Sequence, residues 1–274
     1  MNLHDLDKLT RTFSAEGRMP VLFLGHGSPM NAIEENDFVR GFRKVAQEIP
    51  KPRAILCVSA HWETRGTFLT AMENPRTIHD FGGFPRELFD VRYPAPGSPE
   101  LAQEAKALAR RTEIGLDMAW GLDHGCWSVV KHLYPEAEVP VIQMSLDRTQ
   151  APRNHYALAA ELRSLREKGV LVVGSGNIVH NLAMVDWRRL DESFGHDWAL
   201  EASERIKGHI LDGDHLPLID YTAHGREFQL SIPTPDHYLP LLYALAMKGE
   251  DEPVRFFNDV PVAGAITMTS LVIG

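Results

Sequence analysis

The sequence predicts an α/β fold in a single domain, whose central sheet, mostly parallel or mixed, is flanked by helices on both faces. Two observations predict it. Short, uninterrupted apolar runs recur at residues 21–24, 54–58 and 170–173, and a mainly apolar run lies at 139–146, as expected for strands that are buried on both faces of a sheet. Segments with helical spacing of their apolar residues separate these runs, which is typical of strand-helix-strand units.

The first half of the chain begins with a polar leader at residues 1–19 and a strand that ends at His26. Residues 36–49 place their apolar side chains on one stripe, which predicts a helix. After a second strand at 54–59, residues 74–97 are rich in proline, glycine and aromatic residues without a sustained period. We expect an ordered active-site loop there, because long connections in compact domains are often lids or binding loops.

The second half alternates predicted helices and strands. Ser98, Pro99 and Glu100 combine an N-cap residue, a first-turn proline and an early acidic residue, so a helix is expected to begin there. Further helices are expected at 127–133, 152–168 (closed by Gly169), 191–211 and 235–247, and further strands at 139–146, 170–173 and 262–273. Since no repeat or interdomain linker interrupts this pattern, we expect residues 1–274 to form one domain.

Composition and charge argue against several classes of protein. The 274 residues carry a formal net charge of −9 without a clustered basic face, which argues against a nucleic-acid partner. No apolar stretch approaches the roughly 20 residues that span a bilayer, and residues 1–5 lack the basic start of a signal peptide. We therefore expect a cytoplasmic protein with no membrane contact. Cys57 and Cys126 have no CxxC spacing and are expected to be buried, reduced thiols.

Histidines recur where strand-like runs stop. His26 and His61 follow the first two runs, and His180 follows the run at 170–173 after a short loop. Two more, His124 and His237, lie in a loop and at an expected helix start. Open α/β sheets bind ligands outside the carboxyl ends of their strands. Imidazoles that converge there can hold a divalent metal ion, so the pattern predicts a metal site.

Three of these histidines are the expected metal ligands, and each has a plainer alternative. His26 lies between glycines that let the backbone approach a ligand closely, although it could simply be a turn histidine. His61 follows the strand expected at the centre of the sheet, where a hydrogen-bonded core histidine is the alternative. His237 falls in the first turn of an expected helix, whose positive end favours the neutral ring. Its alternative is an exposed surface histidine.

The other candidate site residues are expected to act on a substrate. His124 and His180 can serve as general acid or base, because imidazole titrates near working pH, or they can be structural. His79, on the expected active-site loop, is expected to contact substrate or to order the loop. The candidate aromatic walls, for which ordinary packing is the alternative, are Phe81, Phe84, Trp62 and Trp127.

An ordered set of motifs carries more information than any one of these residues. The set comprises Gly25-His26-Gly27-Ser28-Pro29, Ser59-Ala60-His61-Trp62, His79-Asp80-Phe81-Gly82-Gly83-Phe84-Pro85, Gly121-Leu122-Asp123-His124-Gly125, Gly174-Ser175-Gly176-Asn177-Ile178-Val179-His180-Asn181 and Pro235-Asp236-His237-Tyr238. Taken together, these motifs resemble the class III extradiol ring-cleavage dioxygenases, and among them the 4,5-DOPA extradiol dioxygenase subgroup. The resemblance runs from about residue 20 to the C-terminus.

This resemblance implies a single catalytic domain with non-haem Fe(II), which uses O2 to open the ring of a small catechol such as DOPA. The implied metal ligands are His26, His61 and His237. His180 would then handle the catechol proton, and His124 would polarise the substrate or an intermediate. The wider superfamily has a glutamate where this chain has His237. A site made of histidines alone carries less negative charge, so Zn(II) can also occupy it in purified protein.

Two other functions remain open from the sequence. A site of three histidines could hold zinc and activate water, which would make the chain a zinc-dependent hydrolase of a small substrate. The superfamily fold also resembles that of Memo-like proteins, which would make the chain a non-catalytic binding protein. Oxygen uptake with catechols would distinguish the dioxygenase from both alternatives.

Overall fold

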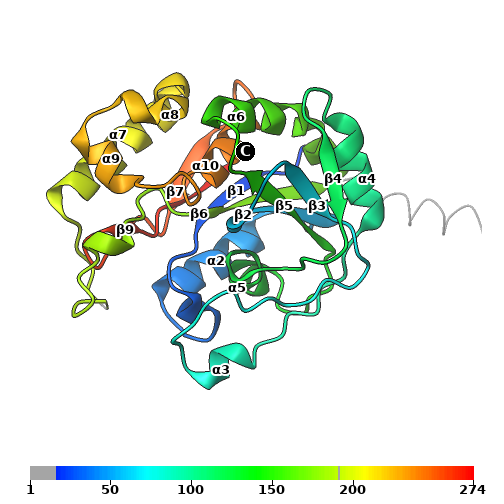
Figure 1. Cartoon of the computed structure of the whole chain (residues 1–274), viewed down its shortest axis with the longest axis horizontal. Coiled ribbons are helices and arrows are strands. Elements are labelled where there is room, and N and C mark those ends of the chain that lie inside the picture. The colour runs from blue at the N-terminus through cyan, green and yellow to red at the C-terminus, as the bar shows by residue number, and fades with distance from the viewer. Residues whose placement is uncertain (1–16, 191) are drawn as a thin grey trace, which may run out of the picture.

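The computed structural model describes residues 17–190 and 192–274, and within them eight strands form one mixed sheet (Figure 1). The strand order is β4-β3-β5-β2-β6-β1-β10-β7. The strands are β1 (Val21–Gly25), β2 (Ala54–Thr64), β3 (Thr67–Thr70), β4 (Ile114–Asp117), β5 (Val141–Asp147), β6 (Val170–Gly176), β7 (Val254–Phe257) and β10 (Ser270–Ile273). The pairs of β6 with β1 and β2, and of β2 with β5, are parallel, whereas β10 is antiparallel to β1 and β7. The α/β fold with a mixed sheet is thus confirmed.

Helices cover both faces of the sheet. They are α2 (Asp37–Glu48), α3 (Arg86–Phe89), α4 (Pro99–Leu108), α5 (His124–Leu133), α6 (Pro152–Glu161), α7 (Asp197–Asp212), α8 (Leu216–Ile219), α9 (Arg226–Ser231) and α10 (Leu239–Ala246). Short 3-10 turns lie at Pro29–Ala32, Arg163–Lys168, Leu182–Met184 and Tyr221–Ala223, and a small hairpin pairs β8 (Pro261–Val262) with β9 (Ile266–Thr267). None of these described helices is both long and apolar enough to cross a membrane.

Side chains of the central strands point alternately to the two faces of the sheet, and so the core has two layers. Val21 and Phe23 of β1 pack in a cluster with side chains of α4, α6, α7 and α10. Leu22 and Leu24, one position along, pack in a second cluster with α2 and α5. Because successive side chains of a strand point to opposite faces, a strand covered on both sides is mainly apolar on both faces. This explains the uninterrupted apolar runs in the sequence.

Several predicted elements have different bounds in the structure. Strand β2 runs to Thr64, so His61 lies inside the strand, and the pairing with β5 shifts between Val58 and Glu63. His124 is the first residue of α5 and not part of the preceding loop. The helix expected at 191–211 begins at Asp197, and the strand expected at 262–273 is broken into β8, β9 and β10.

The expected active-site loop at 74–97 is largely irregular, with α3 as its only helix among the described residues. Its start is tied to the rest of the domain by a bridge from Thr77 to Leu122, and the indole of Trp127 donates a hydrogen bond of 2.7 Å to the Ile78 carbonyl. Of the polar leader, residues 1–16 lie outside the described part. Its last residue, Met19, is buried in the core.

A buried ion pair fastens the C-terminal end of the chain to the core. Arg166 is completely buried, and its guanidinium donates to both carboxylate oxygens of Glu252 at 2.6 and 2.7 Å. It also donates to the carbonyls of Met19 and Met247. Burial of the Glu252 carboxyl opposes its ionisation, but the hydrogen bonds from Arg166 lower the pKa of Glu252 below its ordinary value.

Replacing Glu252 by alanine should therefore destabilise the fold by about 3 kcal/mol, because it leaves a buried guanidinium without its partner. Since the folded pKa of Glu252 is lowered, the stabilisation is present above the unfolded pKa of about 4.3 and is lost as the pH falls below it. Denaturant titrations at several pH values measure both effects. Glu167→Ala, which removes an exposed pair with Arg18, is the control and should cost less than about 1 kcal/mol. Equal losses in the two variants would contradict the prediction.

Candidate metal centre

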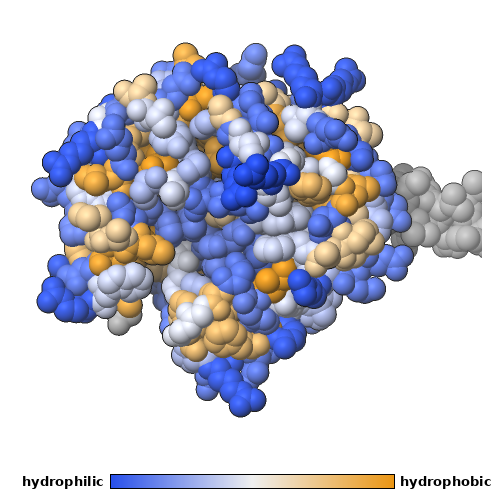
Figure 2. Space-filling model, viewed as in Figure 1, coloured by the Kyte–Doolittle hydropathy of each residue, from blue (hydrophilic) through white to orange (hydrophobic). Residues whose placement is uncertain are grey.

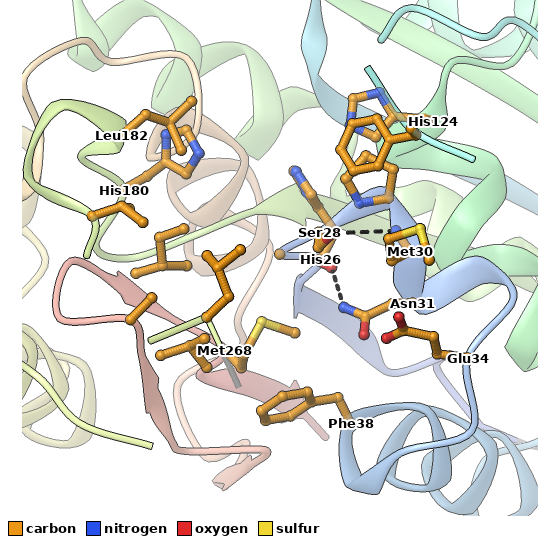
Figure 3. A pocket seen from close by; sticks show the side chains of 18 of the residues that line it. His26, Ser28, Met30, Asn31, Glu34, Phe38, His124, His180, Leu182 and Met268 are labelled. Carbon is orange, nitrogen blue, oxygen red and sulfur yellow. Dashed lines mark hydrogen bonds between the residues drawn. The ribbon is translucent and has the colours of Figure 1, made fainter. Parts of the chain in front are cut away.

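Five histidines from separate parts of the chain line one cavity of about 900 Å³ at the carboxyl ends of the central strands. His26 follows β1, His61 lies near the end of β2, and His180 follows β6. His124 begins α5, and His237 precedes α10. Figure 3 shows His180 and Leu182 across the cavity from His124 and Met30. All five histidines that the sequence singles out are therefore brought together.

The ring of His26 has a fixed orientation. Ser175 donates its only hydroxyl hydrogen to the Gly125 carbonyl, so its oxygen accepts from Nδ1 of His26 at 3.1 Å. The side-chain amide of Asn31 also donates, through Nδ2, to the main-chain oxygen of His26 at 3.0 Å. With its hydrogen on Nδ1, neutral His26 presents the lone pair of Nε2 to the cavity.

His61 faces His26 closely. Their Nε2 atoms are 3.1 Å apart, and Nδ1 of His61 is 3.6 Å from a carboxylate oxygen of Asp80. Two ligand nitrogens at about 2.1 Å from one metal ion are about 3.0 to 3.4 Å apart at octahedral to tetrahedral angles. The separation of His26 and His61 fits that requirement. Burial, and then the neighbouring histidines, lowers the pKa of both rings well below the ordinary value, so both are neutral and able to bind a metal ion.

His124 is held by the expected active-site loop. Asp80 accepts one hydrogen bond from the His124 amide at 2.8 Å and another from its Nδ1 at 2.9 Å. Although burial opposes ionisation of Asp80, the hydrogen bonds that it accepts from the ring and the main chain of His124 lower its pKa. The Nε2 atom of His124 remains as the free nitrogen. The closest group of three donor nitrogens in the described part of the chain is that of His26, His61 and His124, all within 4.8 Å of one another.

His237 is positioned from two directions. Its Nδ1 donates to the carboxylate of Asp236, and its carbonyl accepts from the Asn177 amide at 2.9 Å. Burial opposes ionisation, but the hydrogen bond with His237 lowers the pKa of Asp236 to about 2. A side chain at Gly176 would place its Cβ 2.1 Å from the His237 carbonyl oxygen, so only glycine lets the end of β6 approach this closely.

His180 stacks on His237 and lies over the same cavity. The two rings are 3.5 Å apart between centroids, at an interplanar angle of 8°. Burial, followed by the proximity of His237, lowers the pKa of His180 to about 3. His180 is therefore a neutral imidazole that can accept a proton, and a nearby substrate anion would raise its pKa.

The predicted aromatic residues divide into two groups. Phe84 lines the cavity, and Phe81 packs edge-on against His124 at 5.4 Å between centroids. Trp62 instead stacks on Trp120, and the fully buried Trp127 lies beneath the loop. Neither tryptophan is among the residues that line the cavity in the described part of the chain. Their contact with substrate stays a prediction.

His79 also lies on the loop side of the site. Its Nε2 is 3.0 Å from the Val91 carbonyl, and its ring packs against Phe81 and Trp127. These contacts fit the loop-ordering role that the sequence offered as one of two roles for His79, and the substrate contact stays a prediction.

Sequence reasoning missed the residues that hold the imidazoles. Asp80 and Ser175 hydrogen-bond to His124 and His26 across 44 and 149 residues of sequence. Asp236 is adjacent to His237 in the sequence, and this adjacency could have indicated that its carboxylate orients the ring. Metal-binding histidines usually donate their second ring nitrogen to a carboxylate or another acceptor, which fixes the ring and raises its basicity.

Imidazoles with fixed orientations, gathered at strand ends beside a large cavity, are the donor set expected of a metal-dependent α/β enzyme. Comparison with known families gives the identity: the chain belongs to the family described as the catalytic LigB subunit of aromatic ring-opening dioxygenase, which matches residues 20–267. The resemblance seen in the motifs is thereby confirmed.

Relatives and a solved structure agree with this assignment. A protein named 4,5-DOPA dioxygenase extradiol from Escherichia coli K12 is 45% identical over 94% of this chain and 95% of its own length. A protein of the same name from Beta vulgaris is 32% identical over 86% of this chain and 90% of its own. The crystal structure of an uncharacterized protein, JW3007, from Escherichia coli K12 has a TM-score of 0.82 at 41% identity. It aligns over 94% of this chain and all of the other.

The chain is therefore a ring-cleavage dioxygenase of the extradiol type, which acts on a small aromatic substrate and O2. The family and the cluster of histidines together indicate a metal cofactor.

Proposed function

We propose that the protein is a non-haem Fe(II) dioxygenase that opens the ring of a small catechol, with DOPA as a representative substrate. The observation that carries this proposal is the near-equilateral arrangement of three imidazoles beside the cavity. The ring centroids of His26, His61 and His237 are 5.0, 5.0 and 5.2 Å apart. Three imidazoles that share one ion at about 2.1 Å from nitrogen have centroids roughly 4.5 to 5.2 Å apart.

This ring geometry favours His237 over His124 as the third ligand. His124 is 5.8 Å from His26 but only 3.8 Å from His61 between centroids. It therefore packs on His61, although its nitrogen belongs to the closest group of three. We assign the metal to His26, His61 and His237, and a contact with the substrate to His124.

An Fe(II) ion in such a site would have open positions for both the catechol oxygens and O2, and so would couple electron transfer from ring to oxygen. The residues of the cavity move the proton, contact the substrate and limit the entry of water. His180, neutral and stacked beside His237, accepts the proton of a catechol hydroxyl. His124, held by Asp80, contacts the oxygen atoms of the bound substrate. The loop that carries Asp80 and Phe84 covers this side of the cavity and limits the entry of water.

The donor set does not by itself select the metal. Three imidazoles bind Zn(II) at least as readily as Fe(II), because affinity for such sites follows the general order of the divalent metals. We expect zinc in protein purified aerobically and activity only after iron is loaded.

The test is to load the metal-free protein with Fe(II) under nitrogen and then measure oxygen uptake with catechol and DOPA. One equivalent of O2 should be consumed for each catechol, with formation of a yellow ring-opened product. Zn(II)-loaded protein is the control and should consume none. Oxygen-independent hydrolysis of esters by the zinc form, without oxygen uptake by the iron form, would contradict the proposal.

A further inference from the structure

The cavity extends far beyond the histidines. Its volume of about 900 Å³ is near the upper end of the roughly 300 to 1,000 Å³ range of sites for drug-sized ligands. A catechol ring and its two oxygens fill only the end beside the imidazoles. The rest of the cavity has room for a group attached to the ring.

One wall of this outer part is the segment 182–190, which exposes an unusual number of large apolar side chains. Leu182, Trp187 and Leu190 are 49%, 62% and 47% exposed, and all three line the cavity. Among residues 17–190 and 192–274, no neighbour removes these side chains from water, although burying apolar surface is favourable. An apolar ligand group lying against them would supply that burial.

The wall is held in place before any ligand binds. The Asp186 amide donates to the Ala263 carbonyl at 3.0 Å, and the Asn181 amide donates to the Ala265 carbonyl at 3.0 Å. Val185 also packs with the two alanines in a small apolar cluster. The segment is thereby fixed to the β8–β9 hairpin, which reduces the ordering cost of ligand binding.

The facing wall is also apolar. Met30 and Phe38 lie on the opposite side from Leu182, and Met268 lies between the two walls (Figure 3). On the face seen in Figure 2, the surface is hollowed between the part that carries β9 and the part that carries α2 and α5, with orange apolar side chains on both sides. The two walls form an apolar channel that leads away from the imidazoles.

No lysine or arginine lines the cavity in the described part of the chain, whose acidic lining residues are Glu34 and Glu192. Glu192 is already paired with Arg189 at 2.7 and 2.9 Å. A carboxylate on the outer part of a substrate would therefore lose water without gaining a cationic partner, which is unfavourable.

We propose that, among catechols, the preferred substrate carries an uncharged apolar extension of several carbon atoms on its ring. DOPA, whose side chain carries a carboxylate and an ammonium group, is then a substrate that binds less tightly than the preferred one. The extension lies along the wall formed by Leu182, Trp187 and Leu190. The position of the catechol ring at the histidines rests on the proposed function, whereas the apolar channel is a separate feature of the cavity.

The test measures binding as well as turnover. Titration calorimetry under nitrogen, with zinc-loaded protein, compares catechol, 4-methylcatechol, 4-butylcatechol and 4-hexylcatechol. Affinity should rise about fourfold for each buried methylene, so burial of only two of the added methylenes makes the hexyl compound bind more than tenfold more tightly than the methyl compound. An affinity that does not change along the series would overturn the proposal, even if oxygen uptake with catechol and iron confirms the dioxygenase. A rising series without any oxygen uptake would leave the channel established and refute the proposed reaction.

Alanine variants inside and outside the cavity test whether the extension lies along this wall. Trp187→Ala and Leu182→Ala should each lower the affinity for 4-hexylcatechol at least fivefold and leave that for 4-methylcatechol within twofold. Leu211→Ala removes a side chain that is 63% exposed outside the cavity, and should change neither. Equal losses for the short and long compounds in the wall variants, or the same loss in Leu211→Ala, would overturn the assignment to this wall.

Two compounds that differ only in the charge of the extension test its chemical nature. The methyl ester of 3-(3,4-dihydroxyphenyl)propanoic acid should bind at least tenfold more tightly than the free acid at neutral pH. Tighter binding of the acid would show that the channel receives a carboxylate and would overturn the proposal.

Discussion

Alanine in place of His61 should remove the bound metal and lower kcat/KM with catechol by about a thousandfold or more. The metal supplies several kcal/mol of charge stabilisation to the transition state, and each 1.36 kcal/mol is worth a factor of ten in rate. His61 presents Nε2 at 3.1 Å from that of His26, so its loss leaves the ion with fewer imidazoles. Atomic absorption gives the metal content per chain, and an oxygen electrode gives the rate. His209→Ala, which lies on α7 away from the cavity, should change neither.

The same two measurements decide the third ligand. His237→Ala should lose metal as His61→Ala does, because its ring completes the near-equilateral set. His124→Ala should keep its metal and lose rate, because its ring packs against His61. If His124→Ala lost the metal and His237→Ala retained it, the closest group of nitrogens would be the metal site and our assignment would be wrong.

The second large effect is expected at His180. Glutamine at this position should leave the metal content unchanged and lower kcat about 10²- to 10⁴-fold, which is the usual contribution of a positioned general acid or base. His180 is buried, neutral and stacked on His237, so its nitrogen is available to the substrate proton. KM for catechol should change much less than kcat, since binding depends chiefly on the metal and the cavity walls.

Metal content is the readout that a purely structural role would move. Loss of metal in His180→Gln would show that His180 supports His237 or binds the ion itself. A kcat within threefold of that of the unaltered protein would show that another group handles the proton.

The sequence predicted the parts of the site that follow from the periodicity of the fold. His26 and His180 could be placed at one edge because parallel strands present their carboxyl ends on the same side. The apolar runs of β1, β2 and β6 are long enough to be recognised as buried strands. The ordered motifs then carried the family assignment, which no single histidine could have done.

The remainder depends on contacts that no local pattern records. Strands β3 and β4 are four residues each and were not predicted, because so short a run gives little periodicity. The irregular pairing after Val58 carries β2 past His61, and strand bulges of this kind leave little trace in composition. The hydrogen bonds of Asp80 and Ser175 join residues distant in sequence, so they become visible only once the chain is folded.

The contact of Gly176 with the His237 carbonyl has a consequence for directed evolution of this enzyme. Randomising position 176 should return glycine almost alone, because every other residue pushes a main-chain oxygen and the ring attached to it. Position 187, by contrast, is open to water and takes no part in that contact, so many residues should be accepted there. New substrate scope is therefore most accessible through the outer wall, with the strand ends left untouched.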